Sequence, residues 1–231
     1  MERTIARLEP LLTPARRRRL RSVLATRSDH VAFVFERMID PHNLSAALRT
    51  LDAFSFQDAH LIAPGERLAI AGGITLGAHR WLSLHAGEST AACLEGLRAA
   101  GYRVYASHLG KEATSLTEID FSRRTALVFG NEHLGVSAEL LEATEHRFRI
   151  DMLGFSQSLN LSVAVAISAF HARQALERLG AGEGAPERFL LDETRRRAVY
   201  AQWLIQSVRN AGRILAEDEE LYIEGKIQGG V

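Results

Sequence analysis

The chain has 231 residues, of which 46% are hydrophobic and 24% are charged, and its formal net charge is zero. This length and composition predict one main folded domain with appended segments rather than two full domains. No run approaches the roughly 18 consecutive apolar residues of a membrane span, and residues 1–4 do not begin an apolar secretory signal. The single cysteine, Cys93, cannot form an internal disulfide, so we expect a cytoplasmic protein.

The neutral total hides a basic N-terminal segment. Residues 1–27 contain eight arginines and two glutamates. Five of the arginines put positive charge on every face of an expected helix: Arg16, Arg17, Arg18, Arg19 and Arg21. Such a cluster is costly unless it meets a polyanion. By itself it fits either a solvated helix or a phosphate-binding one.

The hydrophobic pattern predicts alternating helices and strands. A helical arm reaches to about Thr26, with Thr13 and Pro14 at the start of its main helix. The expected strands cover residues 31–35, 59–63, 81–84, 103–106, 125–129 and 148–150. The expected helices cover residues 43–54, 89–100, 136–143 and 159–179. This alternation predicts an α/β fold with a mainly parallel sheet covered on both faces.

The C-terminal part of the chain is expected to be a separate helical arm. Residues 180–186 are rich in glycine and predict a flexible linker. The segment beyond them carries three consecutive arginines at residues 195–197 and an acidic block at residues 217–220.

Two common nucleotide-binding folds are excluded by their missing motifs. In the segment FGNEHLG, residues 129–135, two glycines have four residues between them, but Val136 and Ser137 follow where a P-loop has lysine and serine or threonine. The first expected strand is followed by ERMIDPHN, which lacks the glycine-rich turn of a Rossmann fold.

Three segments are more polar than a purely structural role requires. In DPHNLSAALRT, residues 40–50, Asn43 is expected to cap the helix that it opens, and Arg49 follows six residues later. In FGNEHLG, Glu132 follows a strand end, where α/β proteins place ligands. The alternatives are a helix cap with a surface arginine and a tight turn with a solvated acid.

The third segment is IDMLGFSQSLNLSVA, residues 150–164. Exposure of Met152, Leu153 and Phe155 to water would be unfavourable, so we expect them to line a pocket or an interface. Ser158 and Asn160 stand near the start of the following helix. Ordinary loop packing is the alternative.

In order and spacing, these segments resemble the three motifs of SpoU-type methyltransferases of the SPOUT superfamily, and are most similar to the TrmH group. The matching patterns are N-x-x-x-x-x-R, F-G-N-E-x-x-G and I-x-M-x-G-x-x-Q-S-L-N-x-S-V-A, within residues 31–179. The resemblance implies an α/β domain with a deep C-terminal trefoil knot, acting as a homodimer. It also implies S-adenosylmethionine-dependent 2′-O-methylation of RNA, with a D-loop guanosine of tRNA as the expected target. Ribosomal RNA methylation and a catalytically silent RNA-binding knot are the alternatives.

The resemblance also implies roles for individual residues. Arg49 would orient a phosphate beside the target ribose and stabilise the developing 2′-alkoxide, because arginine is too basic to be an ordinary general base. Its expected catalytic neighbours are Asn43, Glu132, Ser158 and Asn160. The expected cofactor-binding residues are Leu127, Phe129, Gly130, Ile150, Met152, Leu153, Ser158 and Leu159. With an RNA substrate, the five clustered arginines become expected phosphate contacts.

The expected division of the chain has three parts. Residues 1–28 form a basic helical arm, residues 29–180 form the knotted methyltransferase domain, and residues 181–231 form the linker and the C-terminal helical arm.

Overall fold

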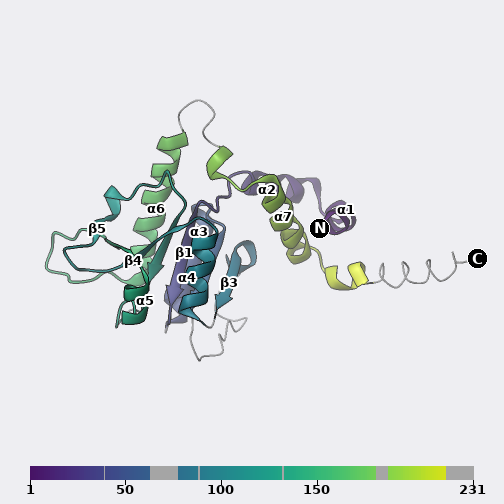
Figure 1. Ribbon diagram of the computed structural model, residues 1–231. Helices are drawn as coiled ribbons and strands as arrows, with labels where there is room; N and C mark the ends of the chain where they lie inside the picture. The colour runs from purple at the N-terminus through teal and green to yellow at the C-terminus, as the bar shows by residue number, and fades with distance from the viewer. Residues whose placement is uncertain (39, 63–77, 88, 132, 181–186, 217–231) are drawn as a thin grey trace, which may run out of the picture. The chain divides into compact units, whose positions relative to one another are not determined.

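The computed structural model describes residues 1–38, 40–62, 78–87, 89–131, 133–180 and 187–216 (Figure 1). The chain divides into two compact units, a larger one of Arg27–Leu190 and a smaller one formed by Met1–Thr26 with the segment that begins at Leu191. Among the helices that are described, none combines the length and the apolar character needed to cross a bilayer. The expected linker at residues 181–186 and the acidic block at residues 217–220 lie outside the described residues.

The larger unit is built on a seven-stranded sheet in the order β3-β2-β1-β6-β4-β7-β5. Every neighbouring pair of these strands is parallel. The strands are β1 (Val31–Glu36), β2 (Asp58–Ile62), β3 (Ser83–Gly87), β4 (Arg103–Ser107), β5 (Thr114–Ser115), β6 (Thr125–Phe129) and β7 (His146–Arg149). The predicted parallel α/β sheet is therefore confirmed, with β1 and β6 side by side at its centre.

Helices cover both faces of the sheet. Buried residues of α3 (Pro41–Ala53) and α6 (Leu161–Gly180) share one hydrophobic cluster, and those of α4 (Thr90–Ala99) and α5 (Ala138–Ala143) share the other. Short 3₁₀ helices complete the larger unit: η2 (Ala78–Trp81), η3 (Leu116–Glu118) and η4 (Glu187–Phe189). Ser89 and Ser137 cap α4 and α5 with their side chains, as these residue types favour.

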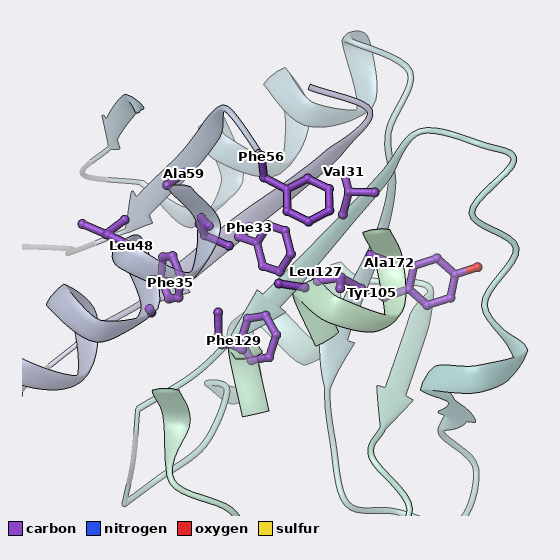
Figure 2. Close-up of a cluster of buried hydrophobic side chains, with 14 of the residues drawn as sticks. Val31, Phe33, Phe35, Leu48, Phe56, Ala59, Tyr105, Leu127, Phe129 and Ala172 are labelled. Atoms are coloured by element: carbon purple, nitrogen blue, oxygen red, sulfur yellow. The ribbon is translucent and has the colours of Figure 1, made fainter. Parts of the chain in front are cut away.

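The burial of β1 in the core explains why its sequence is a nearly continuous run of apolar residues. All six of its residues are buried, because the strand is central and covered on both faces. Phe33 and Phe35 lie in the α3 and α6 cluster, with their rings 6.3 Å and 6.2 Å from that of Phe129 (Figure 2). Ala32 and Val34 alternate with them and face α4 and α5.

Helix α3 is held at its C-terminal end by two guanidinium groups. Arg27 donates to the carbonyl of Phe56 at 2.9 Å and also bonds Asp52. Arg173 of α6 donates from Nε and Nη2 to the carbonyl of Phe54, at 2.8 and 2.6 Å. Cations are favourable beside the last carbonyls of a helix. These contacts fix the far end of the helix that carries Arg49.

The smaller unit packs α1 (Glu2–Leu8), η1 (Glu9–Leu11) and α2 (Pro14–Leu24) with α7 (Glu193–Ser207). Thr13 caps α2 by accepting from the backbone N–H of Arg16 at 3.2 Å, which confirms the predicted helix start. The carboxylate of Glu9 accepts hydrogen bonds of 2.6 Å from both Arg21 and Tyr200. The side chain of Glu9 in η1 therefore forms hydrogen bonds with both α2 and α7.

Candidate active site

The three polar segments follow strands whose carboxyl ends share one edge of the sheet. β1 and β6 are neighbours, and the first two segments follow them directly. The third follows β7, two strands away from β6. The carboxyl edge of a parallel sheet is where open α/β proteins bind ligands.

Asn43 does not cap α3, so that part of the prediction is wrong. The cap is Asp40, whose side chain accepts from the backbone N–H of His42 at 2.8 Å, with Pro41 among the first helical residues. Aspartate caps a helix as well as asparagine does, and proline favours the first helical position. Asn43 stands within the first turn, and its Oδ1 accepts a hydrogen bond from Asn160 at 3.1 Å.

Asn160 joins the third segment to the first. Its Oδ1 accepts from the backbone N–H and the hydroxyl of Ser162, at 2.9 and 2.6 Å, so it acts as the cap of α6. Its Nδ2 donates to Asn43 across 117 positions of the sequence. The structure therefore brings together two of the predicted site residues.

Arg49 presents an exposed side chain on α3. Its neighbour Leu48 is 1% exposed and belongs to the core, so the backbone beneath the guanidinium is well packed. The side chain of Arg49 forms no hydrogen bond or ion pair with the residues that the structure describes. A guanidinium in this state can meet an external anion without first losing a partner.

The loop of residues 130–137 explains the glycine spacing of the second segment. A Cβ on Gly130 would lie 2.1 Å from the carbonyl carbon of Gly135, so only glycine fits there. Gly135 has φ +69°, a left-handed conformation that glycine adopts without strain. The backbones of Asn131 and Gly135 exchange hydrogen bonds of 3.0 and 2.8 Å. Glu132, predicted as a catalytic neighbour, lies outside the described residues.

Two residues that were not among the predicted site residues hold this loop to the end of β1. Glu36 is 1% exposed, and its carboxylate accepts from the backbone N–H of Ser137 at 2.8 Å and from the Ser137 hydroxyl at 2.5 Å. The side chain of Asn131 donates to the carbonyl of Arg37 at 3.0 Å. An acid at the end of an apolar strand was the available signal for Glu36, since burial of such a group requires hydrogen-bond partners.

The residues expected to hold the cofactor differ in their exposure. Leu127, Phe129 and Gly130 are buried at the end of β6, whereas Leu153 and Ser158 are exposed. The remaining three, Ile150, Met152 and Leu159, are partly buried. Phe155, which was expected to line a pocket or an interface, is fully exposed like Leu153.

The backbone of residues 152–159 forms no hydrogen bond with any other part of the chain that the structure describes. Backbone donors and acceptors beside apolar side chains suit an adenine ring and a thioether chain.

The start of this segment is fixed by Asp151. Its carboxylate accepts from the hydroxyl of Ser115 at 2.5 Å and from Nε of Arg149 at 2.8 Å. These hydrogen bonds, the one from Ser115 first, lower the pKa of Asp151. They link the end of β7 to β5, so the segment leaves the sheet from a defined point.

A parallel sheet with polar segments gathered at the carboxyl ends of its strands defines the class of α/β ligand-binding proteins. Residues 30–170 match the SpoU rRNA Methylase family, and the chain belongs to this family. The family membership predicted from the sequence is thereby confirmed.

Individual relatives cover most of the chain. A Thermus thermophilus protein named tRNA (guanosine(18)-2′-O)-methyltransferase is 38% identical over 192 residues, which cover 83% of this chain and 97% of the relative. The crystal structure of the A. aeolicus TrmH/SpoU tRNA modifying enzyme is similar with a TM-score of 0.73 and 31% identity, covering 85% of this chain and 98% of that one.

A more distant structure bears on the cofactor. An AdoMet-bound rRNA methyltransferase from Sinorhizobium meliloti is similar with a TM-score of 0.55 and 28% identity, covering 68% of this chain and 60% of that one. S-adenosylmethionine is therefore the expected cofactor, in agreement with the chemistry of residues 152–159.

Proposed function

We infer that this protein transfers the methyl group of S-adenosylmethionine to the 2′-hydroxyl of a ribose in tRNA. Family membership and the names of the relatives support the reaction and the substrate. The observation that carries the proposal in this chain is the hydrogen bond between Asn43 and Asn160. It joins the helix that presents Arg49 to the segment expected to hold the cofactor.

The proposed chemistry depends mainly on positioning. When bound, the cofactor supplies an electrophilic methyl group on a sulfonium centre. Arg49 binds a phosphate beside the target ribose and stabilises the negative charge that develops on the 2′-oxygen. It remains protonated throughout, as a guanidinium does near neutral pH. Asn43 and Asn160, with Ser158 and Glu132, keep the ribose and Arg49 in place, which lowers the entropic part of the barrier.

The cofactor would be held by the ends of β6 and β7 and the segment after β7. In this proposal one wall of the cofactor site consists of residues 127, 129 and 130. A second wall consists of residues 150, 152 and 153. Residues 158 and 159 complete the site. Backbone groups would bind the adenine, and apolar side chains would exclude water from the methyl group. The knotted path of the chain implied by the family resemblance belongs to this same proposal.

We also propose that the active form is a homodimer. Apolar side chains remain exposed along α6 and in the segment before it: Leu153, Phe155, Val163, Ile167 and Phe170. The helical positions recur at intervals of three and four residues, so they form one stripe on α6. Large exposed apolar surfaces mark sites of association. A second copy of this chain is the partner that the family resemblance implies.

The basic arm is proposed to bind the RNA backbone. Arg18 and Arg19 are exposed on α2, with no ion pair or hydrogen bond of their side chains to other described residues. Arg21 differs, because Glu9 and Tyr200 engage it. The division of the chain at residues 28 and 180 is thus a proposal about function. In it, the two helical arms bind RNA and the middle part catalyses methyl transfer. A tRNA substrate would place the protein in the cytoplasm.

The test is methyl transfer from labelled S-adenosylmethionine to defined transcripts. We expect label on one D-loop guanosine of a tRNA transcript. We expect no label on a matched transcript that carries a single 2′-deoxyguanosine at that position. Equal labelling of both transcripts would contradict ribose methylation, and labelling of ribosomal RNA fragments without labelling of tRNA would establish the alternative substrate.

A further inference from the structure

A buried carboxylate stands at the carboxyl end of the central strand β1. Glu36 is the last residue of that strand and is 1% exposed. A carboxylate is unfavourable in such a place unless hydrogen bonds compensate it. Both of its oxygens are occupied, one by the backbone N–H of Ser137 at 2.8 Å and the other by the Ser137 hydroxyl at 2.5 Å.

These bonds fix one end of the loop of residues 130–137. Ser137 is the cap of α5, and its Oγ also accepts from the backbone N–H of Leu140 at 3.2 Å. Glu36 therefore binds the residue at which the loop becomes a helix. The contact spans 101 positions of the sequence and joins the end of β1 to the start of α5.

The neighbouring residue fixes the other end of the loop. Arg37 has φ 51°, a left-handed conformation that costs free energy for any residue but glycine. Its backbone is held on both sides: its N–H donates to the carbonyl of Ile62 at 2.8 Å, and its carbonyl accepts from Asn131 at 3.0 Å. The last residue of β1 and the one after it thus hold Ser137 and Asn131, which are six positions apart.

The described residues between these attachments are joined by further hydrogen bonds. Asn131 and Gly135 exchange two backbone hydrogen bonds, and Gly130 has no room for a side chain. The side-chain oxygen of Asn131 also accepts from the backbone N–H groups of His133 and Leu134, at 2.7 and 3.2 Å. These contacts join Asn131 to Gly135, so the attachments of Asn131 and Ser137 to the end of β1 set the position of this part of the chain.

We propose that Glu36 is a positioning residue for methyl transfer. By holding Ser137, it sets the loop after β6, which begins at Gly130 of the expected cofactor wall, against the β1–α3 segment that leads to Asn43 and Arg49. The proposal rests on the proposed function. Glu36 is not assigned a role in proton transfer, because it is buried and both oxygens already accept hydrogen bonds from Ser137.

The experiment compares Glu36→Ala with Glu36→Gln. For the alanine variant we expect kcat to fall about tenfold or more and the Kd for S-adenosylhomocysteine to rise about fivefold, since the loop loses its fixed position. The KM for tRNA should stay within about twofold, because the basic arm supplies most of the phosphate contacts. Glu36→Gln should recover most of the kcat and most of the affinity for S-adenosylhomocysteine. The reason is that its amide can accept from the Ser137 N–H and donate to the Ser137 hydroxyl.

Two serine variants separate positioning from ordinary stabilisation. Ser137→Ala and Ser89→Ala each remove a helix cap, of α5 and α4. Ser137→Ala should cost more thermal stability, because it also leaves one oxygen of the buried Glu36 carboxylate without a partner. Only Ser137→Ala should lower kcat and weaken S-adenosylhomocysteine binding. This pair also tests the proposal if Glu36→Ala does not fold.

Three results would overturn the proposal. The first is a Glu36→Ala variant with wild-type kcat and wild-type Kd for S-adenosylhomocysteine. The second is an equal loss of kcat and of S-adenosylhomocysteine affinity in Ser89→Ala and Ser137→Ala. The third is a Glu36→Gln variant whose kcat and Kd are as impaired as those of Glu36→Ala. Calorimetry with S-adenosylhomocysteine needs no RNA. If the wild type binds this compound but methylates no tRNA, the proposed substrate fails while the role of Glu36 is still measured.

Discussion

Arg49 combines an exposed guanidinium with a helix held at both ends. Asn160 bonds Asn43 in the first turn of α3, and Arg173 bonds the carbonyl of Phe54 after its last turn. The backbone position of a side chain on such a helix is fixed, so only the side-chain torsions become ordered when the side chain binds RNA. This arrangement suits a group whose task is orientation.

Replacement of Arg49 by lysine tests that task. Lysine keeps the positive charge but lacks the planar fork that binds a phosphate through two parallel hydrogen bonds. We expect Arg49→Lys to lower kcat about 100-fold, as misplacement of a reacting group by about 1 Å can do, with little change in tRNA affinity. Arg103→Lys is the matched control, because Arg103 is exposed at the amino end of β4. Near-normal turnover by Arg49→Lys would contradict the orienting role.

His30 makes the stability of the larger unit depend on pH. The side chain is 8% exposed, and Nε2 lies 3.0 Å from the carbonyl of Phe121. Burial lowers the pKa of His30 below its ordinary value, so folding disfavours protonation of this ring. The unfolded chain takes up a proton near the ordinary histidine pKa of about 6.5. The stabilisation is thus present above that pH and is lost as the pH falls below it.

We therefore expect the denaturant midpoint of the wild type to fall between about pH 7 and pH 5. In His30→Gln, which keeps a donor for Phe121, the fall should be smaller. It should not vanish, because burial also lowers the pKa of His171. Parallel pH curves for the two proteins would show that His30 does not contribute.

At the scale of elements, the arginines of α2 are not equivalent. Arg21 binds Glu9 and lies over the ring of Tyr200 at 5.7 Å, so it contributes to the packing of the smaller unit. Arg18 and Arg19 are exposed, without such contacts among the described residues. Phosphate binding is therefore expected to depend on these two more than on Arg21.

The double variant Arg18→Gln, Arg19→Gln should weaken tRNA binding and leave kcat at saturating tRNA unchanged. Each phosphate contact that is lost should reduce the slope of log affinity against log salt by about 0.7 to 0.9. Arg21→Gln should instead lower the thermal stability with a smaller change in the salt slope. An unchanged slope in the double variant would exclude α2 from the RNA interface.

The elements were predictable where a local pattern decides them. The expected strand at residues 125–129 matches β6 residue by residue, because a central strand buried on both faces is a continuous apolar run. The two-residue strand β5 was not predicted, since it is too short to show alternation. The cap of α3 was assigned to Asn43 instead of Asp40, because both residue types cap helices and the sequence does not show which backbone N–H is near.

For the candidate site, the sequence motifs were predictable, but the hydrogen bonds that hold the motif segments in place were not. Asn43 and Asn160 were singled out from separate segments, and the structure joins them. Glu36 was not, because its partner Ser137 lies 101 positions away, and one sequence does not reveal such a pairing. The hydrogen bond from Ser115 to Asp151 is a second support of this kind.

At the scale of the whole molecule, the apolar stripe on α6 predicts association. Ile167→Asp should convert the proposed dimer into a monomer in sedimentation experiments, because a charge would be buried without a partner at the proposed interface. Leu109→Asp is the control, since Leu109 is 63% exposed and stands in the chain between β4 and β5, outside α6. If Ile167→Asp sediments like the wild type, α6 does not form the interface.

The most direct test of the central claim is a map of 2′-O-methylated riboses in total RNA. The map should compare cells that contain the protein, cells that lack it, and cells in which Arg49→Lys replaces it. We predict that one D-loop guanosine in a set of tRNAs loses its methyl group when the protein is absent, and regains it only in small part with the variant. An unchanged tRNA map, or a change confined to ribosomal RNA, would contradict the account.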